Sequence, residues 1–219
     1  MGKEAISIAV GEGTVSALLE VPAGAKACYV VAHGAGAGMN HSFMAAVAEG
    51  LAARGVATLR YQFPYMEKAS KRPDVPKVAH AAVRAAVAEA AVRIPKLALY
   101  AGGKSFGGRM TSQAQAESPL PGVRGLAFLG FPLHAPGKPS DDRAEHLVNV
   151  KVPMLFLQGS RDELADLELL VPLVARLGGS AKVEIFEDAD HSFHVPARTG
   201  KKDAEVMEEL LDTLAAWMK

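Results

Sequence analysis

Six short apolar runs, separated by longer stretches with helical periodicity, most limit how this chain can fold. Each run is nearly continuous in apolar residues rather than alternating, which is typical of strands buried on both faces of a parallel sheet. The runs are Ala27–Ala32, Val56–Tyr61, Lys96–Ala101, Val123–Leu129, Val152–Leu157 and Lys182–Phe186. Because parallel strands need crossover connections, which are usually helices, the pattern predicts an α/β fold.

The intervening stretches supply those crossovers. Right-handed crossovers place helices on both faces of a doubly wound, mostly parallel sheet, with catalytic groups beyond the carboxyl ends of its strands. Before the first run, Ala5–Val10 and Thr14–Val21 flank a turn-prone Gly-Glu-Gly and predict an antiparallel hairpin. The expected helices are Phe43–Arg54, Val75–Arg93, Phe106–Glu117, Leu164–Leu177 and Asp203–Met218.

Length and charge restrict the classes of function. A chain of 219 residues with 49% hydrophobic content fits a single domain, 1–219. Lysine plus arginine and aspartate plus glutamate number 24 each, so no net charge favours nucleic acid or an anionic membrane. Cys28 is the only cysteine and lies in an apolar run, which excludes an internal disulfide and a thiolate metal cluster. With no leader-like or membrane-length apolar segment, we expect a cytoplasmic protein with a small-molecule partner; the oligomeric state stays open.

The stretch AGGKSFGGRM, residues 101–110, fits two chemistries. Its GKS resembles the end of a phosphate-binding loop, whereas Gly103, Ser105 and Gly107 match the GxSxG turn that presents a nucleophilic serine between a strand and a helix. A phosphate-binding loop needs a glycine five positions before Gly103, where Ala98 lies inside a predicted strand. We therefore expect LALYA to be a strand, GGKSFGG a tight turn and Ser105 a nucleophile; an inert serine in a glycine-rich turn is the alternative.

A serine needs a histidine base and a carboxylate that orients it. His191, in DADHSF, directly follows the last predicted strand and is the favoured base. His194, three residues further on, is the rival candidate for the base. Its alternative roles are a surface histidine or a substrate contact.

The carboxylate is expected from a strand end between the serine and the histidine. Asp162, in QGSRDE, follows the run that ends at Leu157. Its alternative role is to cap a helix beginning at Leu164. Glu163 and Asp166 are weaker candidates because they fall at or within that helix.

Acyl transfer also needs backbone N–H donors for the oxyanion. Phe106, after the serine, and Ala35, in the small-residue loop VAHGAGAGM, are the expected donors. A dinucleotide-binding GxGxxG is the alternative for this loop, but its third glycine would fall on Met39 or on His41. We expect no cofactor and no metal.

Four motifs in order, HGAGAG, GKSFGG, QGSRDE and DADHSF, resemble the α/β-hydrolase fold over nearly the whole chain. The compact form without a cap domain resembles the dienelactone-hydrolase-like group. This resemblance implies a serine hydrolase acting on a small ester or thioester. Dienelactone hydrolase itself uses cysteine, whereas this chain has Ser105, so lactone specificity does not transfer. A hydrolase-fold protein that binds a partner or ligand with little or no turnover is the alternative.

Candidate substrate contacts lie on loops expected to face Ser105. They are Met39, Phe63, Tyr65, Phe131 and His134. Loop packing is the favoured role for Phe63 and Tyr65.

Two features bear on specificity. Lys104 precedes the serine, and is expected either to form a structural ion pair or to anchor an acidic substrate. Between two strands, only the loop Phe131–Ser140 and a short helix near Arg143–Val148 are available as a cover. We therefore expect no cap domain and an open, shallow site that favours short acyl groups.

Overall fold

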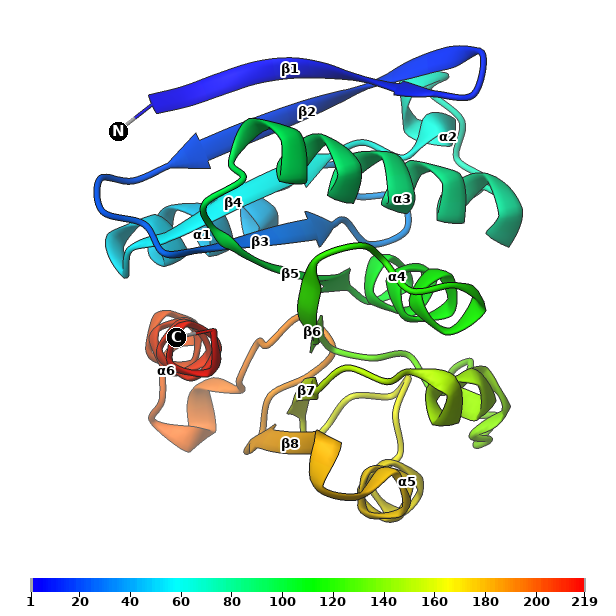
Figure 1. Ribbon diagram of the computed structural model, residues 1–219. Helices are drawn as coiled ribbons and strands as arrows, with labels where there is room; N and C mark the ends of the chain where they lie inside the picture. The colour runs from blue at the N-terminus through cyan, green and yellow to red at the C-terminus, as the bar shows by residue number, and fades with distance from the viewer. Residues whose placement is uncertain (1, 219) are drawn as a thin grey trace.

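An eight-stranded sheet forms the centre of the protein, as Figure 1 shows for the computed structural model, which describes residues 2–218. The spatial order of the strands is β1-β2-β4-β3-β5-β6-β7-β8. Their bounds are β1 Gly2–Val10, β2 Gly13–Val21, β3 Ala27–Ala32, β4 Val56–Tyr61, β5 Ala98–Lys104, β6 Val123–Leu129, β7 Met154–Gly159 and β8 Ala181–Phe186.

Strand direction confirms the predicted fold class. β1 and β2 form an antiparallel hairpin, and β2 pairs antiparallel with β4. All remaining neighbours, from β4 through β3 to β8, are parallel. The carboxyl ends of β3 to β8 therefore meet at one edge of the sheet, where loops carry the predicted site residues.

Helices cover both faces of this sheet (Figure 1). Side chains of α3, α4 and α5 pack into one apolar cluster, and those of α1 and α6 pack into a second cluster across the sheet. The helices are α1 Ser42–Ala53, α2 Pro64–Glu67, α3 Pro76–Arg93, α4 Phe106–Glu117, α5 Leu167–Leu177 and α6 Asp203–Trp217, with short 3₁₀ turns η1 Asp142–Asn149, η2 Gly178–Ser180 and η3 Ala197–Thr199. None of the helices in residues 2–218 has the length and apolar character to span a membrane.

Most predicted elements are present with boundaries shifted by a few residues, and two of the shifts bear on the site. β5 continues to Lys104, through glycines that we expected to form the turn. α5 begins at Leu167 rather than Leu164, with Asp166 as its cap: the Asp166 carboxylate accepts from the Glu168 N–H. Asp162 is therefore not the cap of α5.

The glycines of β5 allow neighbouring backbones to approach closely. β5 lies between β3 and β6, and a Cβ at Gly102 or Gly103 would clash with the carbonyl oxygen of Ala127 or Ala32. The strand thus continues to Lys104, despite a register shift against β6 between Leu99 and Ala101, and the change of direction is concentrated at Ser105.

The segment between β6 and β7 holds a loop, an isolated bridge between Ala135 and Lys138, and η1. It is too short to form a cap domain, as expected. Cys28 lies in β3, is fully buried, and has its thiol pKa raised to about 12 by that burial.

We predict that Gly103→Ala lowers the free energy of unfolding by about 3 kcal/mol, because its methyl group overlaps the Ala32 carbonyl. Urea denaturation measures the change. Gly179→Ala is the control, since a Cβ at Gly179 meets no atom within 4 Å. Equal stability of the two variants would contradict the close approach of β5 to β3.

Candidate active site

Ser105 lies at a strained turn between β5 and α4. Its backbone has φ 50° and ψ −117°, an unfavourable conformation for a residue with a side chain. The Ser105 N–H donates to the Leu129 carbonyl at 3.2 Å, and the Arg109 N–H donates to the Ser105 carbonyl at 3.1 Å. A Cβ at Gly107 would lie 2.6 Å from two carbonyl oxygens of the β3 strand end, so the helix starts in tight contact with the sheet.

A cavity of about 720 Å³ opens at this turn. Ser105 and His191 both line it, although 86 positions apart in the sequence. The other lining residues come from the β3–α1 loop, the start of α1, the end of β5, the loop after β7 and the β8–α6 region; they are Gly34, Ala35, Ala37, His41, Ser42, Phe43, Ala46, Lys104, Leu164, Ser192, His194 and Asp203.

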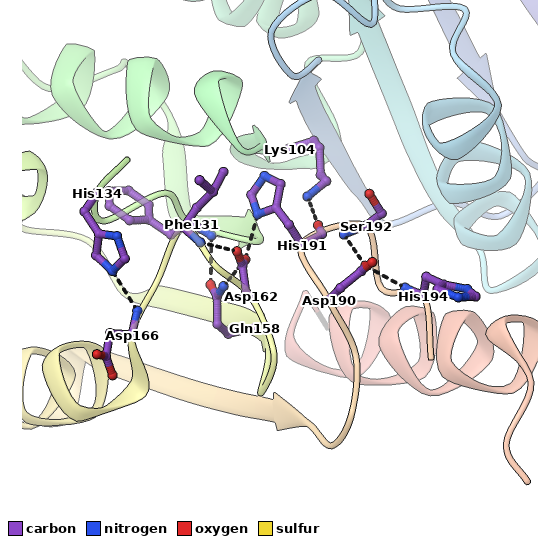
Figure 2. A network of polar contacts seen from close by, with 11 residues as sticks. Lys104, Phe131, His134, Gln158, Asp162, Asp166, Asp190, His191, Ser192 and His194 are labelled. Atoms are coloured by element: carbon purple, nitrogen blue, oxygen red, sulfur yellow. Dashed lines mark hydrogen bonds and ion pairs between the residues drawn. The ribbon is translucent and has the colours of Figure 1, made fainter. Parts of the chain in front are cut away.

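His191 forms its closest polar contact with Asp162. Its Nδ1 lies 2.6 Å from Asp162 Oδ2, and Figure 2 shows the ring pointing toward that carboxylate. The Asp162 side chain is 0% exposed. Because an ionised carboxylate only accepts hydrogen bonds, Nδ1 carries the proton of the neutral imidazole, which leaves Nε2 as a proton acceptor.

Two further donors hold the Asp162 carboxylate (Figure 2). The Gln158 side-chain amide donates to Oδ2, and the Leu164 N–H donates to Oδ1 at 2.8 Å. Gln158 is itself fixed, because its Oε1 accepts from the Phe131 N–H at 2.9 Å. Sequence reasoning missed Gln158. The available signal was a polar side chain directly after the apolar run that ends at Leu157.

His194 makes a different contact. Its Nδ1 lies 2.8 Å from Asp203 Oδ2, and both side chains are more than half exposed, at 62% and 56%. Asp203 raises the pKa of His194. Both residues line the cavity, so His194 lies at the site but is paired with a surface carboxylate rather than with Asp162.

A second Ser–His pair lies away from the cavity. Ser112 Oγ is 2.7 Å from His146 Nε2, and the Ser112 hydroxyl donates to the Arg109 carbonyl. Burial, together with the charge of Arg109, lowers the pKa of His146 to about 4. Ser112 is fully buried, so this pair has no access to a substrate.

Buried side chains hold the loop after β3 in place. His33 Nε2 accepts from the Phe63 N–H at 3.1 Å, which leaves Nδ1–H to donate to the Gly34 carbonyl at 2.7 Å. Burial lowers the pKa of His33, consistent with this neutral form. The Gly36 N–H donates to the Tyr65 hydroxyl at 2.9 Å.

Two backbone N–H groups beside Ser105 remain free. Phe106 is the first residue of α4, where an N–H has no partner within the helix. Within residues 2–218, neither the Phe106 N–H nor the Ala35 N–H donates to a protein acceptor. Gly34 places the two segments in contact, because a Cβ there would lie 3.8 Å from Ser105 Cβ.

The five predicted substrate contacts do not line the cavity. Met39, Phe63, Tyr65, Phe131 and His134 are each 7% exposed or less. They hold loops instead. Met39 N–H donates to Gln62 Oε1 at 2.8 Å, and His134 Nε2 accepts from the Asp166 N–H at 3.0 Å. The sequence placed these residues on the correct edge of the sheet, but their side chains turn inward.

Several side chains that do line the cavity come from α1 and from the segment after β7. Phe43 and Ala46 belong to the first turns of α1, His41 caps this helix by accepting from the Phe43 N–H at 3.2 Å, and Leu164 lies on the opposite segment after β7. We did not predict these four, because the direction of the first helix over the site depends on tertiary contacts.

Lys104 also lines the cavity. Its ammonium donates to the backbone carbonyl of His191, and no carboxylate within residues 2–218 forms an ion pair with it. The expected structural ion pair is therefore not found.

No group of three metal-ligating side chains converges anywhere in residues 2–218. The side chains that line the cavity include imidazoles, hydroxyls, a carboxylate and an ammonium.

Comparisons with known proteins bear on the family and the fold of this chain. A family model described as an alpha/beta hydrolase domain matches residues 25–219. Dienelactone hydrolase from Anabaena variabilis is 23% identical, with a TM-score of 0.78 over 99% of this chain and 96% of that one. An alpha-beta serine hydrolase homologue from Coxiella burnetii is 19% identical, with a TM-score of 0.79 over 100% and 99%. A serine hydrolase without a lid from Xanthomonas campestris is 18% identical, with a TM-score of 0.76 over 100% and 96%.

Proposed function

Because this chain belongs to the alpha/beta hydrolase domain family, we propose that it cleaves small carboxylic esters or thioesters through an acyl-enzyme intermediate. One observation carries the proposal: His191, in the same cavity as Ser105, has its Nδ1 committed to a fully buried carboxylate. This leaves Nε2 as the proton acceptor that a serine nucleophile requires.

In the proposed first step, Ser105 Oγ attacks the substrate carbonyl carbon while its proton passes to His191 Nε2. Asp162 stabilises the resulting imidazolium and keeps the ring oriented. The leaving alcohol or thiol takes the proton from Nε2 as its bond to the carbonyl carbon breaks. Water then attacks the acyl-enzyme, with the same imidazole as base, and releases the acid and Ser105.

The oxyanion of each tetrahedral intermediate is proposed to accept from the Phe106 and Ala35 N–H groups. Their lack of protein acceptors supports this role, since donors committed elsewhere would be lost to the intermediate. The Phe106 N–H also lies at the N-terminus of α4, where the helix dipole favours negative charge.

A fluorophosphonate probe tests the proposed nucleophile. We predict one covalent adduct on the wild type, located at Ser105 by peptide mass spectrometry and absent from Ser105→Ala. Ser112→Ala is the matched control, because it removes a serine that is hydrogen-bonded to a histidine outside the cavity and should keep full labelling. Absence of any adduct on the folded wild type would contradict the enzyme and favour a binding protein.

The extent of the cavity predicts the acyl preference. None of residues 130–153, which connect β6 to β7, lines it, so no segment there covers a long acyl chain. Because each buried methylene contributes about 0.8 kcal/mol, kcat/KM rises with acyl length only while the pocket can bury the added carbons. We predict the highest kcat/KM on acetyl to butyryl p-nitrophenyl esters. A steady rise out to the dodecanoyl ester would show that a long acyl site exists.

A further inference from the structure

Lys104 holds a charge in an enclosed place, and no carboxylate within residues 2–218 forms an ion pair with it. Its Nζ lies 5.7 Å from the Phe43 ring centroid and 5.4 Å from that of Phe193. Burial lowers the pKa of Lys104 to about 8, against the opposing effect of Asp162 and Asp190. Such a desolvated cation is unfavourable for folding unless its polar contacts offset the lost hydration.

The polar contact of Lys104 joins two parts of the site. Lys104 is the last residue of β5 and directly precedes Ser105, while its acceptor is the carbonyl of His191 itself, 87 positions away. Figure 2 shows the ammonium reaching over to this loop. The bond therefore ties the strand end that carries the serine to the backbone of the histidine.

Gly130 preserves the space for this contact. It has φ 71°, and a Cβ there would lie 2.9 Å from Lys104 Nζ and 3.3 Å from His191 Nδ1. The ammonium and the imidazole thus lie against the same point at the end of β6. Other bonds of the loop, such as those from the Ser192 and His194 N–H groups to Asp190 Oδ1, are local and do not reach β5.

We propose that Lys104 is a positioning residue whose ammonium fixes the backbone of His191, so that the imidazole stays between Asp162 and Ser105. This inference rests on the proposed function, because it assigns His191 as the base. The ammonium acts through His191 and needs no charge on the substrate.

A pH dependence follows. Above about pH 8 the ammonium loses its proton, and the charge-assisted bond to the His191 carbonyl becomes an ordinary, weaker one. kcat/KM of the wild type should therefore decline on the alkaline side, and Lys104→Met should lack this decline. The titratable groups that face or surround Lys104 are Asp162, Asp190 and His191, and, around the cavity, His41, His194 and Asp203.

The kinetic test compares Lys104→Met with Lys96→Met, an exposed lysine just before the other end of β5. Each is assayed from pH 6 to 10 on a neutral acetyl ester and on a hemisuccinate ester of the same alcohol. For Lys104→Met we expect kcat lower by about 10- to 100-fold on both esters, because a misplaced base loses rate rather than binding. KM should change by less than about 2-fold, and the unfolding midpoint should not fall, since a desolvated charge is removed. Lys96→Met should match the wild type.

A second readout does not depend on turnover. The Nδ1 proton of His191, held against buried Asp162, should give a downfield proton NMR resonance that His191→Gln removes. We expect the resonance to be sharp in the wild type and in Lys96→Met, and broadened by solvent exchange in Lys104→Met. If the wild type neither hydrolyses the esters nor reacts with the fluorophosphonate probe, the proposed function fails. The comparison of the resonance between the wild type and Lys104→Met still tests the positioning of His191.

Three results would overturn the inference. If Lys104→Met lost kcat/KM on the hemisuccinate ester alone, through a higher KM, Lys104 would be an anchor for acidic substrates. If Lys104→Met kept the kinetic constants of the wild type and an unchanged His191 resonance, the bond from Lys104 to the His191 carbonyl would have no effect on the base. A loss of activity with a lowered unfolding midpoint would assign Lys104 a role in stability instead.

Discussion

The buried carboxylate of Asp162 connects the loops that form the site. A carboxylate removed from water must be satisfied by donors, and three reach it: the His191 ring, the Gln158 amide and the Leu164 N–H. Gln158 in turn accepts from the Phe131 N–H. The ends of β6 and β7 and the loop after β8 are thus fixed relative to one another through the side chains of Asp162 and Gln158.

The other half of the site depends on close contact between backbones. Glycines let β5 pack between β3 and β6 up to its last residue, so the reversal into α4 occurs at Ser105, in a strained conformation. The neighbouring loop is held by His33 and Tyr65, which leaves Ala35 exposed at the cavity. The strain at Ser105 and the buried charge at Lys104 both oppose folding, and both lie where the proposed chemistry occurs.

The sequence predicted the sheet and the strand ends well, because a parallel sheet imposes continuous apolar runs that are easy to recognise. Ser105, Asp162 and His191 follow such runs, so the sequence alone predicts that they lie at the same edge. The extent of β5 was missed, since Gly102 and Gly103 look like turn residues in the sequence. Only their contacts with Ala127 and Ala32 show that they belong to a strand.

The lining of the cavity was not predictable in the same way. Whether Phe63 or Phe43 faces the cavity depends on how loops are held by residues distant in sequence, as His33 holds Phe63. The contact of Lys104 was not predictable either, because its hydrogen-bond partner is a backbone carbonyl rather than the expected carboxylate. Local patterns identify which residues reach the functional edge, but not which way their side chains turn.

The rate of Asp162→Asn tests the central role of the buried carboxylate most directly. An asparagine of the same size can present an N–H to His191 Nδ1 and stabilise the wrong tautomer, so we predict a kcat about 10⁴-fold lower with the fold retained by circular dichroism. Asp166→Asn, which alters the cap of α5, is the matched control and should keep the wild-type kcat. A folded Asp162→Asn protein that hydrolyses its ester at close to the wild-type rate would contradict the account.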